Sequence, residues 1–208
     1  MIELHTWGTP NGRKISIMLE ECGLPYSVHK VDISKGEQFK PEFLRISPNN
    51  RIPAIVDPDG PGGKPISLFE SGAILIYLAD KTKKFMPADA AKRYEALQWL
   101  MWQMGGFGPM LGQAHHFLRA APTKIEYGMK RYVDEAKRLY GVLDKQLASN
   151  AFVAGEEYTI ADMSIFPWAA RHEWHTVNLA DFPNVKRWYD IVNARPAVTK
   201  GMAVPYLN

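Results

Sequence analysis

Two hydrogen-bond donors stand close together in the motif Thr9-Pro10-Asn11-Gly12. The hydroxyl of Thr9 and the side-chain amide of Asn11 can both donate to an anion. The motif lies where a strand pattern gives way to a helical one, and the free amides at a helix N-terminus favour negative charge. These residues therefore predict a site that stabilises an anion. For Asn11 taken alone, the alternative is a helix cap or a turn, both of which asparagine favours.

A second polar group comes from Glu70 and Ser71, where another helix is expected to begin. A carboxylate beside a helix N-terminus suits a ligand that carries both an amine and a carboxylate. Upstream, Pro53 interrupts a strand and leaves backbone groups of Ile52 available to an extended, peptide-like ligand. The alternatives are that Ser71 only caps its helix and that Pro53 is an ordinary trans proline at a sheet edge.

The first 80 residues must bring these positions together. Their apolar patterns run in the order strand, helix, strand, then strand, strand, helix. This order matches a thioredoxin-like α/β domain over residues 1–80. The expected strands are Ile2–Trp7, Tyr26–Val31, Ile52–Val56 and Ile66–Phe69, and the expected helices are Asn11–Cys22 and Ser71–Asp80.

Strand signals disappear after a basic linker at residues 81–87. Long helical patterns predict an all-helical domain over residues 88–208. Within it, Thr159 and Asp162 have the spacing of a capping box. The pair Gly105-Gly106 predicts a kink or a close approach, because glycine is unfavourable inside a helix. The expected helices cover residues 88–118, 124–149, 159–176 and 183–194.

The chain has no thiol at its first strand-to-helix junction, where thioredoxin-like redox proteins carry Cys-Pro-x-Cys. Its single cysteine, Cys22, falls on the apolar face near the end of the first expected helix, which favours a buried structural thiol. A nucleophilic sulfur must therefore arrive with a ligand. Two donors, from Thr9 and Asn11, could lower the pKa of that thiol by about one or two units.

Composition limits the other function classes. Apolar residues make up 46% of the 208-residue chain, which is enough for a normal core. The net charge of +3 is too small to indicate a nucleic-acid partner. No apolar run approaches the length of a membrane span. One cysteine excludes an internal disulfide framework, so a reducing cytoplasm is expected.

Taken together, these residues resemble the soluble glutathione transferase family over essentially the whole chain. The Ile52-Pro53 step is similar to the family's cis-proline, Glu70-Ser71 to its motif for the γ-glutamyl group, and Thr159–Asp162 to the capping box of its helical domain. Other stretches resemble the bacterial nu class of this family. The resemblance implies an enzyme that uses glutathione or glutathione disulfide in disulfide-bond reduction. These stretches are Thr9–Gly12, Gly36–Phe43, Ile46–Asn50 and Gly105–Gln113.

The resemblance implies glutathione as co-substrate and a homodimer. It also implies where each part of glutathione lies. The backbone of Ile52, next to Pro53, would pair with the cysteinyl unit, Glu70 would meet the α-ammonium, Ser71 the carboxylate, and Gln38 the glycyl end. For Gln38 the alternative is an exposed polar residue.

The helical half contributes weaker expectations. The resemblance implies that Arg131 reaches a second glutathione or the partner's site, while the alternative is a solvated basic face. A second-substrate pocket is expected from aromatic and apolar residues, with core packing as the alternative. Its expected residues are Trp102, Phe107, Met110 and His115.

No metal site is expected among the histidine pairs of the helical half. His115 and His116 are adjacent and point to different sides of a helix. His172 and His175 share a face but lack an evident third ligand.

The family's usual thiol partners are absent from the junction. Many members use a tyrosine near the end of the first strand, others a serine or a cysteine, and this chain has Trp7 there. The departure favours disulfide reduction over conjugation to electrophiles. A non-enzymatic glutathione-binding or regulatory protein is the remaining alternative, and the intact set of Asn11, Ile52, Glu70 and Ser71 counts against a loss of ligand binding.

Overall fold

The computed structural model describes residues 1–206. Contacts within the chain divide it into two compact units. The first unit comprises residues 1–84 together with the described residues from Arg195 onward, and the second comprises residues 85–194.

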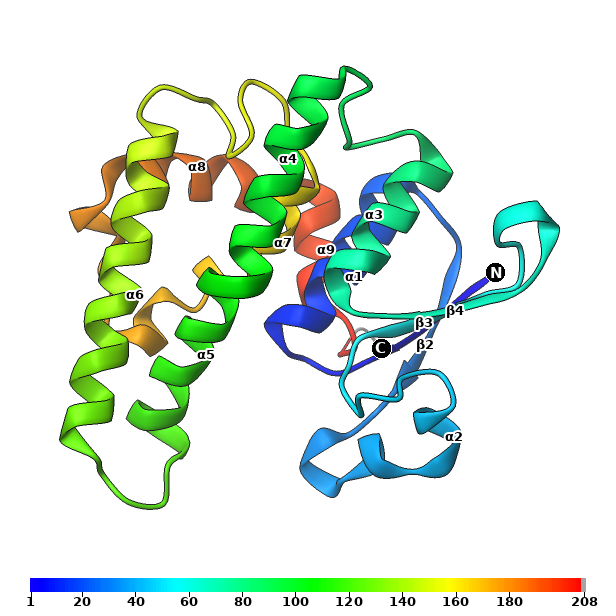
Figure 1. The fold of residues 1–208 in the computed structure, drawn as a ribbon, viewed down its shortest axis with the longest axis horizontal. Coiled ribbons are helices and arrows are strands. Elements are labelled where there is room, and N and C mark those ends of the chain that lie inside the picture. The colour runs from blue at the N-terminus through cyan, green and yellow to red at the C-terminus, as the bar shows by residue number, and fades with distance from the viewer. Residues whose placement is uncertain (207–208) are drawn as a thin grey trace. The chain divides into compact units, whose positions relative to one another are not determined.

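The first unit is built on a four-stranded mixed sheet in the order β2-β1-β3-β4 (Figure 1). Strand β2 runs parallel to β1, whereas β3 pairs antiparallel with both β1 and β4. This arrangement confirms the predicted thioredoxin-like domain. The strands are β1 (Ile2–Thr6), β2 (Tyr26–Lys30), β3 (Ala54–Asp57) and β4 (Ile66–Phe69).

The side chains of β1 point alternately to the two faces of the sheet, and each face is covered by different helices. Its residues alternate between buried and half-buried, as a pleated strand requires. Thr6 faces α1 (Pro10–Cys22), since a Cβ atom placed on Gly12 would lie 2.3 Å from the Thr6 Oγ1 atom. His5 faces the opposite side, where its ring lies 6.3 Å from that of Phe43 in α2 (Pro41–Leu44). Helix α3 (Ser71–Thr82) packs against α1.

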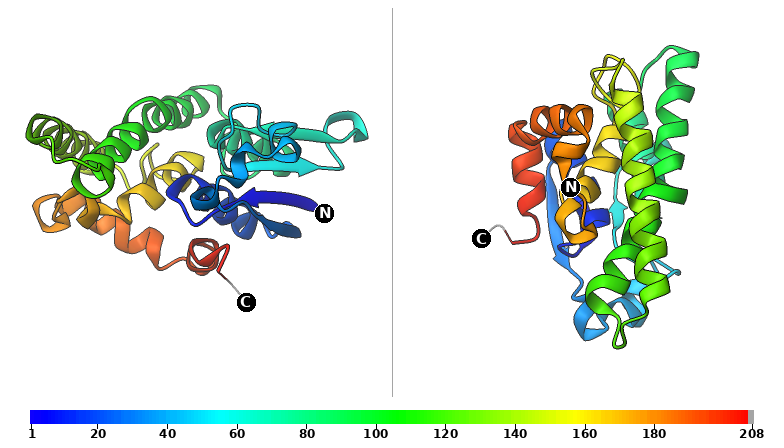
Figure 2. Two further views of the ribbon diagram at one scale, coloured as in Figure 1. Left: turned by 90° about the horizontal axis from the view of Figure 1, so that it is seen from below. Right: turned by 90° about the vertical axis from the view of Figure 1, so that its left-hand side faces the viewer.

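The chain returns to the first unit through a last helix, α9 (Pro196–Ala203), which packs along α1 (Figure 2). The Ser16 hydroxyl donates to the Gly201 carbonyl at 2.7 Å. The Arg195 guanidinium donates to both Glu21 carboxylate oxygens, at 2.6 and 2.8 Å. The sequence-based division assigned everything after residue 88 to a helical domain. The structure differs because these contacts tie α9 to residues more than 170 positions earlier.

The second unit is helical, as predicted (Figure 1). The glycines of the first long helical pattern lie in a π-helical turn, Gln103–Phe107, so the pattern forms two helices rather than one. A Cβ atom on Gly105 or Gly106 would meet nothing within 4 Å, so a kink and not a close approach accounts for this pair. The helices are α4 (Ala90–Trp102), α5 (Gly108–His115), α6 (Glu126–Leu147), α7 (Ile160–Ala169) and α8 (Pro183–Asn193).

The predicted capping box at the start of α7 is confirmed. The fully buried Asp162 carboxylate accepts from the Thr159 amide at 2.9 Å. It also accepts from the Val153 amide at 2.9 Å and from the Trp188 indole N–H at 2.8 Å. One carboxylate therefore joins a loop, the start of α7 and α8.

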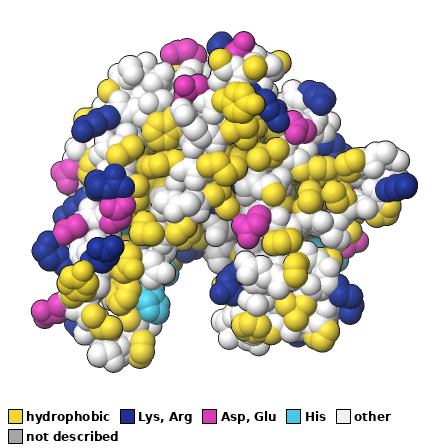
Figure 3. Space-filling model, viewed as in Figure 1, with side chains coloured by type: hydrophobic (Ala, Val, Ile, Leu, Met, Phe, Trp, Pro, Cys, Tyr) yellow, Lys and Arg dark blue, Asp and Glu magenta, His cyan; other side chains and the backbone are white. Residues whose placement is uncertain are grey.

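Within residues 1–206 no helix is both long and apolar enough to cross a membrane. On the face drawn in Figure 3, basic and acidic side chains are interspersed. That face therefore shows no extended patch of a single charge, in keeping with the small net charge of +3.

Candidate functional site in the first unit

The junction between β1 and α1 is built around glycine. A Cβ atom on Gly12 would lie 2.3 Å from Thr6 Oγ1 and 2.5 Å from the Trp7 carbonyl oxygen, so only glycine lets the helix start this close to the strand. Thr9 is the N-cap of α1, and its hydroxyl oxygen accepts from the Gly12 amide at 3.2 Å. No residue in the described part of the chain accepts the hydroxyl hydrogen of Thr9. That hydrogen can therefore be donated to an anion at the helix start.

Asn11 is the second residue of α1 and is half-buried. Because Thr9 occupies the N-cap position, Asn11 does not serve as the cap of this helix. Its amide group thus lies within the first turn, where the helix amides already favour negative charge. Thr9 and Asn11 together place two side-chain donors at one helix end.

Cys22 lies at the other end of α1. At 1.5 Å of rise per residue it is about 16 Å along the helix from Asn11. Its thiol is buried and free, and burial raises the pKa of the Cys22 thiol. The structure thus agrees with the prediction that Cys22 is a structural residue and not the reactive sulfur.

The Ile52-Pro53 peptide bond is cis. Ile52 precedes β3, whose pairing begins at Ala54, and Pro53 is buried. Outside the sheet ladders, no backbone hydrogen bond within residues 1–206 uses Ile52. Its backbone is therefore available to an extended ligand, as expected.

Glu70 and Ser71 lie at the start of α3. Glu70 has φ 68° and ψ 111°, a conformation that non-glycine residues rarely adopt. Strained residues of this kind concentrate at functional sites. Ser71 is the first residue of the helix and is buried.

A buried lysine lies beneath this helix start. The side chain of Lys14 in α1 is only 1% exposed, and its Nζ atom donates to Ser71 Oγ at 3.3 Å. Burial lowers the pKa of Lys14 to about 7, while the Glu70 carboxylate acts in the opposite direction. The Ser71 hydroxyl oxygen therefore accepts a hydrogen bond from Lys14, which helps to fix this side chain at the start of α3.

No motif in the sequence indicated a role for Lys14. One signal was available: cations are unfavourable in the first turn of a helix, and yet Arg13 and Lys14 both lie near the start of α1. Burial of these side chains depends on the packing of α1 against other elements, which the local sequence does not show.

Replacing Lys14 with Met is expected to change how stability depends on pH. In the folded chain the pKa is about 7, below the ordinary value of 10.5, so the unfolded chain binds more protons between these values. The wild type should therefore gain stability relative to K14M as pH rises from 7 towards 10.5, by about 4 kcal/mol. Urea unfolding at several pH values measures this difference. The exposed Lys64→Met is the control, and a K14M difference that does not vary with pH would contradict the burial argument.

Gln38 lies in a short 3-10 turn, Glu37–Phe39. Its Oε1 atom is buried and has no hydrogen-bond partner among residues 1–206. A buried polar atom without a partner is unfavourable, so a ligand donor at this position would satisfy it.

Residues of the second unit

The second unit has a depression of about 600 Å³ along α6, lined by Met110 and Arg131. Arg131 is exposed, and the other lining residues are Tyr127, Lys130, Tyr132, Asp134, Glu135 and Arg138. Two residues predicted from the sequence to bind ligand are thus found in one depression.

Phe107 does not fit the expected second-substrate pocket. It is fully buried, and its ring lies 5.0 Å from that of Trp102 and 5.3 Å from that of Tyr140. Core packing, the alternative stated for this cluster, accounts for its position. His115 is half-buried, and its ring lies 4.9 Å from that of Trp174.

The later histidine pair also has structural roles. The Nδ1 atom of His172 lies 2.9 Å from the Val177 carbonyl oxygen. His175 is fully buried, and burial lowers its pKa to about 3, so it stays neutral. Among the described residues, neither belongs to a group of three side chains at metal-binding distance.

Comparison with known proteins

Residues 9–81 match the family description "Glutathione S-transferase, N-terminal domain", and residues 109–196 match "Glutathione S-transferase, C-terminal domain". Disulfide-bond oxidoreductase YfcG of Escherichia coli (strain K12) is 52% identical over 203 residues, which is 97% of this chain and 94% of that protein. The chain belongs to the glutathione S-transferase family.

Solved structures of related proteins carry the same fold. A glutathione transferase from Burkholderia graminis, solved with two glutathione molecules per subunit, has a TM-score of 0.94 and 49% identity, covering 100% of this chain and 89% of that one. A glutathione transferase from Pseudomonas putida, solved with one glutathione disulfide per subunit, has a TM-score of 0.94 and 48% identity, covering 98% and 91%. The match to these two structures extends over nearly the whole of this chain.

Proposed function

We propose that this glutathione S-transferase family member binds glutathione at the start of α1 and uses its thiolate to reduce disulfide bonds. The observation that carries the proposal is the junction itself: two side-chain donors, Thr9 and Asn11, stand at a helix N-terminus, while the chain's one thiol is buried at the far end of that helix. Such a site has donors for a thiolate but no reactive sulfur of its own. The name of the E. coli relative and the glutathione disulfide in the P. putida structure support this choice of reaction.

The remaining parts of glutathione would lie along the same unit. The backbone of Ile52, fixed by the neighbouring Pro53, would pair with the cysteinyl unit as one strand pairs with another. The carboxylate of Glu70 would meet the α-ammonium. The Ser71 hydroxyl and amide would meet the α-carboxylate, with Lys14 as a positioning residue behind Ser71. Gln38 would contact the glycyl end.

The proposed reaction has two exchange steps. The thiolate of the first glutathione attacks one sulfur of the substrate disulfide, forms a mixed disulfide and releases the other sulfur as a thiolate. A second glutathione thiolate then attacks the glutathione sulfur of the mixed disulfide, so that glutathione disulfide forms and the second substrate thiolate leaves. Two glutathione molecules are oxidised for each disulfide reduced, and the thiolates released take up protons from solvent.

A second glutathione needs a place of its own. Arg131 is exposed beside Met110 in the depression along α6, and its guanidinium suits a carboxylate of a second glutathione. Of the other residues predicted for the second-substrate pocket, Trp102 and His115 are half-buried and so are partly accessible to a ligand. These assignments to a second ligand are part of the proposal.

Comparing two activities of the wild type tests the proposed reaction. Glutathione-dependent reduction of a small disulfide should exceed conjugation of glutathione to a chlorinated aromatic, because the junction lacks the tyrosine or serine that many conjugating relatives use. Faster conjugation would overturn the proposed substrate class. The absence of both activities would favour the non-enzymatic, glutathione-binding alternative.

Replacing Glu70 with Gln is expected to weaken glutathione binding without lowering the turnover rate of the enzyme once glutathione is bound. The change keeps the size of the side chain and removes the charge that pairs with the α-ammonium, so KM for glutathione should rise about tenfold. The kcat value at saturating glutathione should stay within about twofold of the wild type. The exposed Glu42→Gln is the control in the same unit. A fall in kcat with KM unchanged would contradict the role given to Glu70.

A cytoplasmic, homodimeric protein is also part of the proposal. The single buried Cys22 requires no oxidising compartment. A homodimer is the state implied by the family resemblance, and symmetric pairs are the most frequent oligomers. Analytical ultracentrifugation of the purified protein distinguishes a dimer from a monomer.

A further inference from the structure

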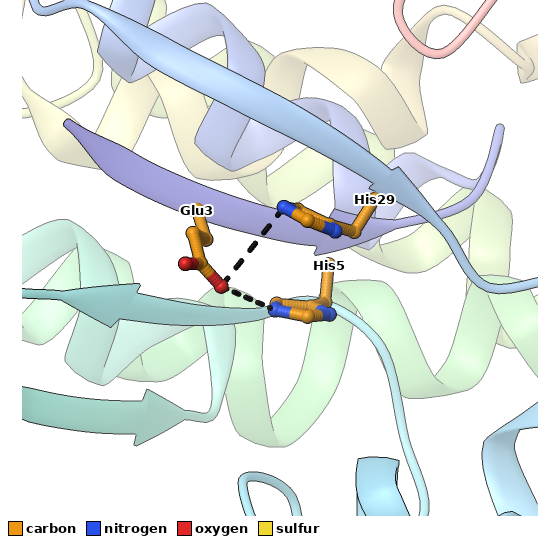
Figure 4. Close-up of side chains that lie close together, drawn as sticks. All are labelled: Glu3, His5 and His29. Carbon is orange, nitrogen blue, oxygen red and sulfur yellow. Dashed lines mark ion pairs between the residues drawn. The ribbon is translucent and has the colours of Figure 1, made fainter.

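Three side chains of types that can bind a metal ion share the sheet face that points away from α1 (Figure 4). His5 in β1 is paired directly with His29 in the parallel strand β2. Glu3 lies two residues before His5, so its side chain emerges on the same face of the strand. Strand register therefore brings His29 next to two residues that lie 24 and 26 positions earlier in the sequence.

The distances between these side chains suit a common ion. The Glu3 Oε2 atom lies 3.5 Å from His5 Nε2 and 3.9 Å from His29 Nε2. One ligand atom from each residue lies within 4.8 Å of the other two. Around a tetrahedral Zn²⁺ ion, with bonds near 2.0–2.2 Å, neighbouring ligand atoms are about 3.3 Å apart. The two imidazole rings are stacked, with centroids 4.6 Å apart and planes 18° apart, so the ring of the exposed His29 must turn before both histidines can point a nitrogen at one ion.

His5 also has an unsatisfied nitrogen. Its Nε2 atom is buried and makes no hydrogen bond within residues 1–206, although it faces the Glu3 carboxylate. An imidazole nitrogen without a hydrogen-bond partner is a group that a metal ion can bind.

The surroundings leave room for an ion and its water. A hollow of about 190 Å³ beside the two histidines is also lined by Phe43 of α2. Two carboxylates, Glu37 and Glu42, and two lysines, Lys30 and Lys40, complete its charged lining. Glu37 already accepts from Lys40 and from a backbone amide, so water is the expected fourth ligand. The lysines limit the affinity, because they repel a divalent cation.

We propose that Glu3, His5 and His29 bind one divalent transition-metal ion of the zinc type. Two imidazoles and one carboxylate are typical ligands for such ions. The ion would join β2, which is an edge strand, to β1. The site is separate from the proposed reaction, since the reacting thiolate would lie at the α1 side of the junction and His5 faces the other way.

Calorimetric titration of the untagged, glutathione-free protein with Zn²⁺ tests this site. The expected result is one ion per chain with a micromolar dissociation constant. His29→Gln removes a half-exposed ligand with little effect on folding and should weaken binding at least tenfold, and Glu3→Gln should act likewise. His116→Gln, an exposed histidine of the second unit, is the matched control and should leave binding unchanged. Hydrogen exchange should also slow in the amides of β2 when zinc is added to the wild type, but not to the His29 variant.

Three outcomes would overturn the proposal. They are the absence of saturable one-to-one binding, equal affinity of the wild type and His29→Gln, and loss of binding in the His116→Gln control. Because neither readout uses the enzymatic reaction, failure of this proposal is distinguishable from failure of the proposed function.

Discussion

Replacing Asn11 with Ala should lower kcat/KM for glutathione-dependent disulfide reduction about 10- to 100-fold at neutral pH. The estimate corresponds to one lost hydrogen bond to a charged sulfur, worth about 1.5–3 kcal/mol. The same loss should move the pH–rate profile upward by about one unit, because less of the bound glutathione is ionised at neutral pH. Steady-state rates measured across pH give both quantities.

The exposed Asn49→Ala in the following loop is the control for this substitution. Because Thr9 and not Asn11 caps α1, the Asn11 variant should keep the N-cap of this helix. Unchanged rates and an unchanged pH profile would show that Asn11 does not contact the sulfur. If Thr9→Val alone then lowered the rate, the hydroxyl would be the thiolate's main partner.

Replacing Asp162 with Ala should destabilise the second unit by about 3–5 kcal/mol, because several buried donors then lose their acceptor at once. The amides of Val153 and Thr159 and the indole of Trp188 all donate to this carboxylate. A typical domain is stable by only about 5–15 kcal/mol, so the variant should unfold at far lower denaturant concentrations. Urea unfolding followed by tryptophan fluorescence measures the change.

Asp190→Ala is the matched control in the same unit. Asp190 pairs with Lys186 at the surface, at 2.6 Å, and exposed pairs of this kind contribute less than about 1 kcal/mol. A loss of 1 kcal/mol or less for Asp162→Ala would mean that water replaces the carboxylate, and that α7 and α8 do not depend on it.

Local sequence signals predicted the elements whose causes are local. The motif Thr9–Gly12 marked the start of α1, and the Thr159–Asp162 spacing marked the start of α7, since caps and turns depend on residues within a few positions. The cis bond before Pro53 was expected from the family resemblance, and the structure confirms it.

Features that depend on distant contacts were not predictable in this way. Helix α9 joins the first unit through Arg195 and Gly201, and nothing in its own periodicity indicates α1 as its partner. Likewise, the helical pattern around Gly105-Gly106 did not distinguish fully buried Phe107 from Met110, which lines a depression. Which face of a helix is covered is decided by the packing of other helices.

Two side-chain clusters show the same limit within the first unit. The contact of Lys14 with Ser71 joins residues 57 positions apart. The group of Glu3, His5 and His29 needs the register between β1 and β2, which fixes His5 opposite His29. A sequence pattern gives the spacing along one strand, but the pairing of strands comes only with the fold.

The pKa of the glutathione thiol bound to the wild type tests the central claim most directly, and it can be followed through the ultraviolet absorbance of the thiolate. A free thiol titrates near 8.5, and the donors at the start of α1 should bring the bound thiol to about 7. A bound thiol that still titrates at 8.5 or above would contradict the claim that this helix start activates a borrowed sulfur.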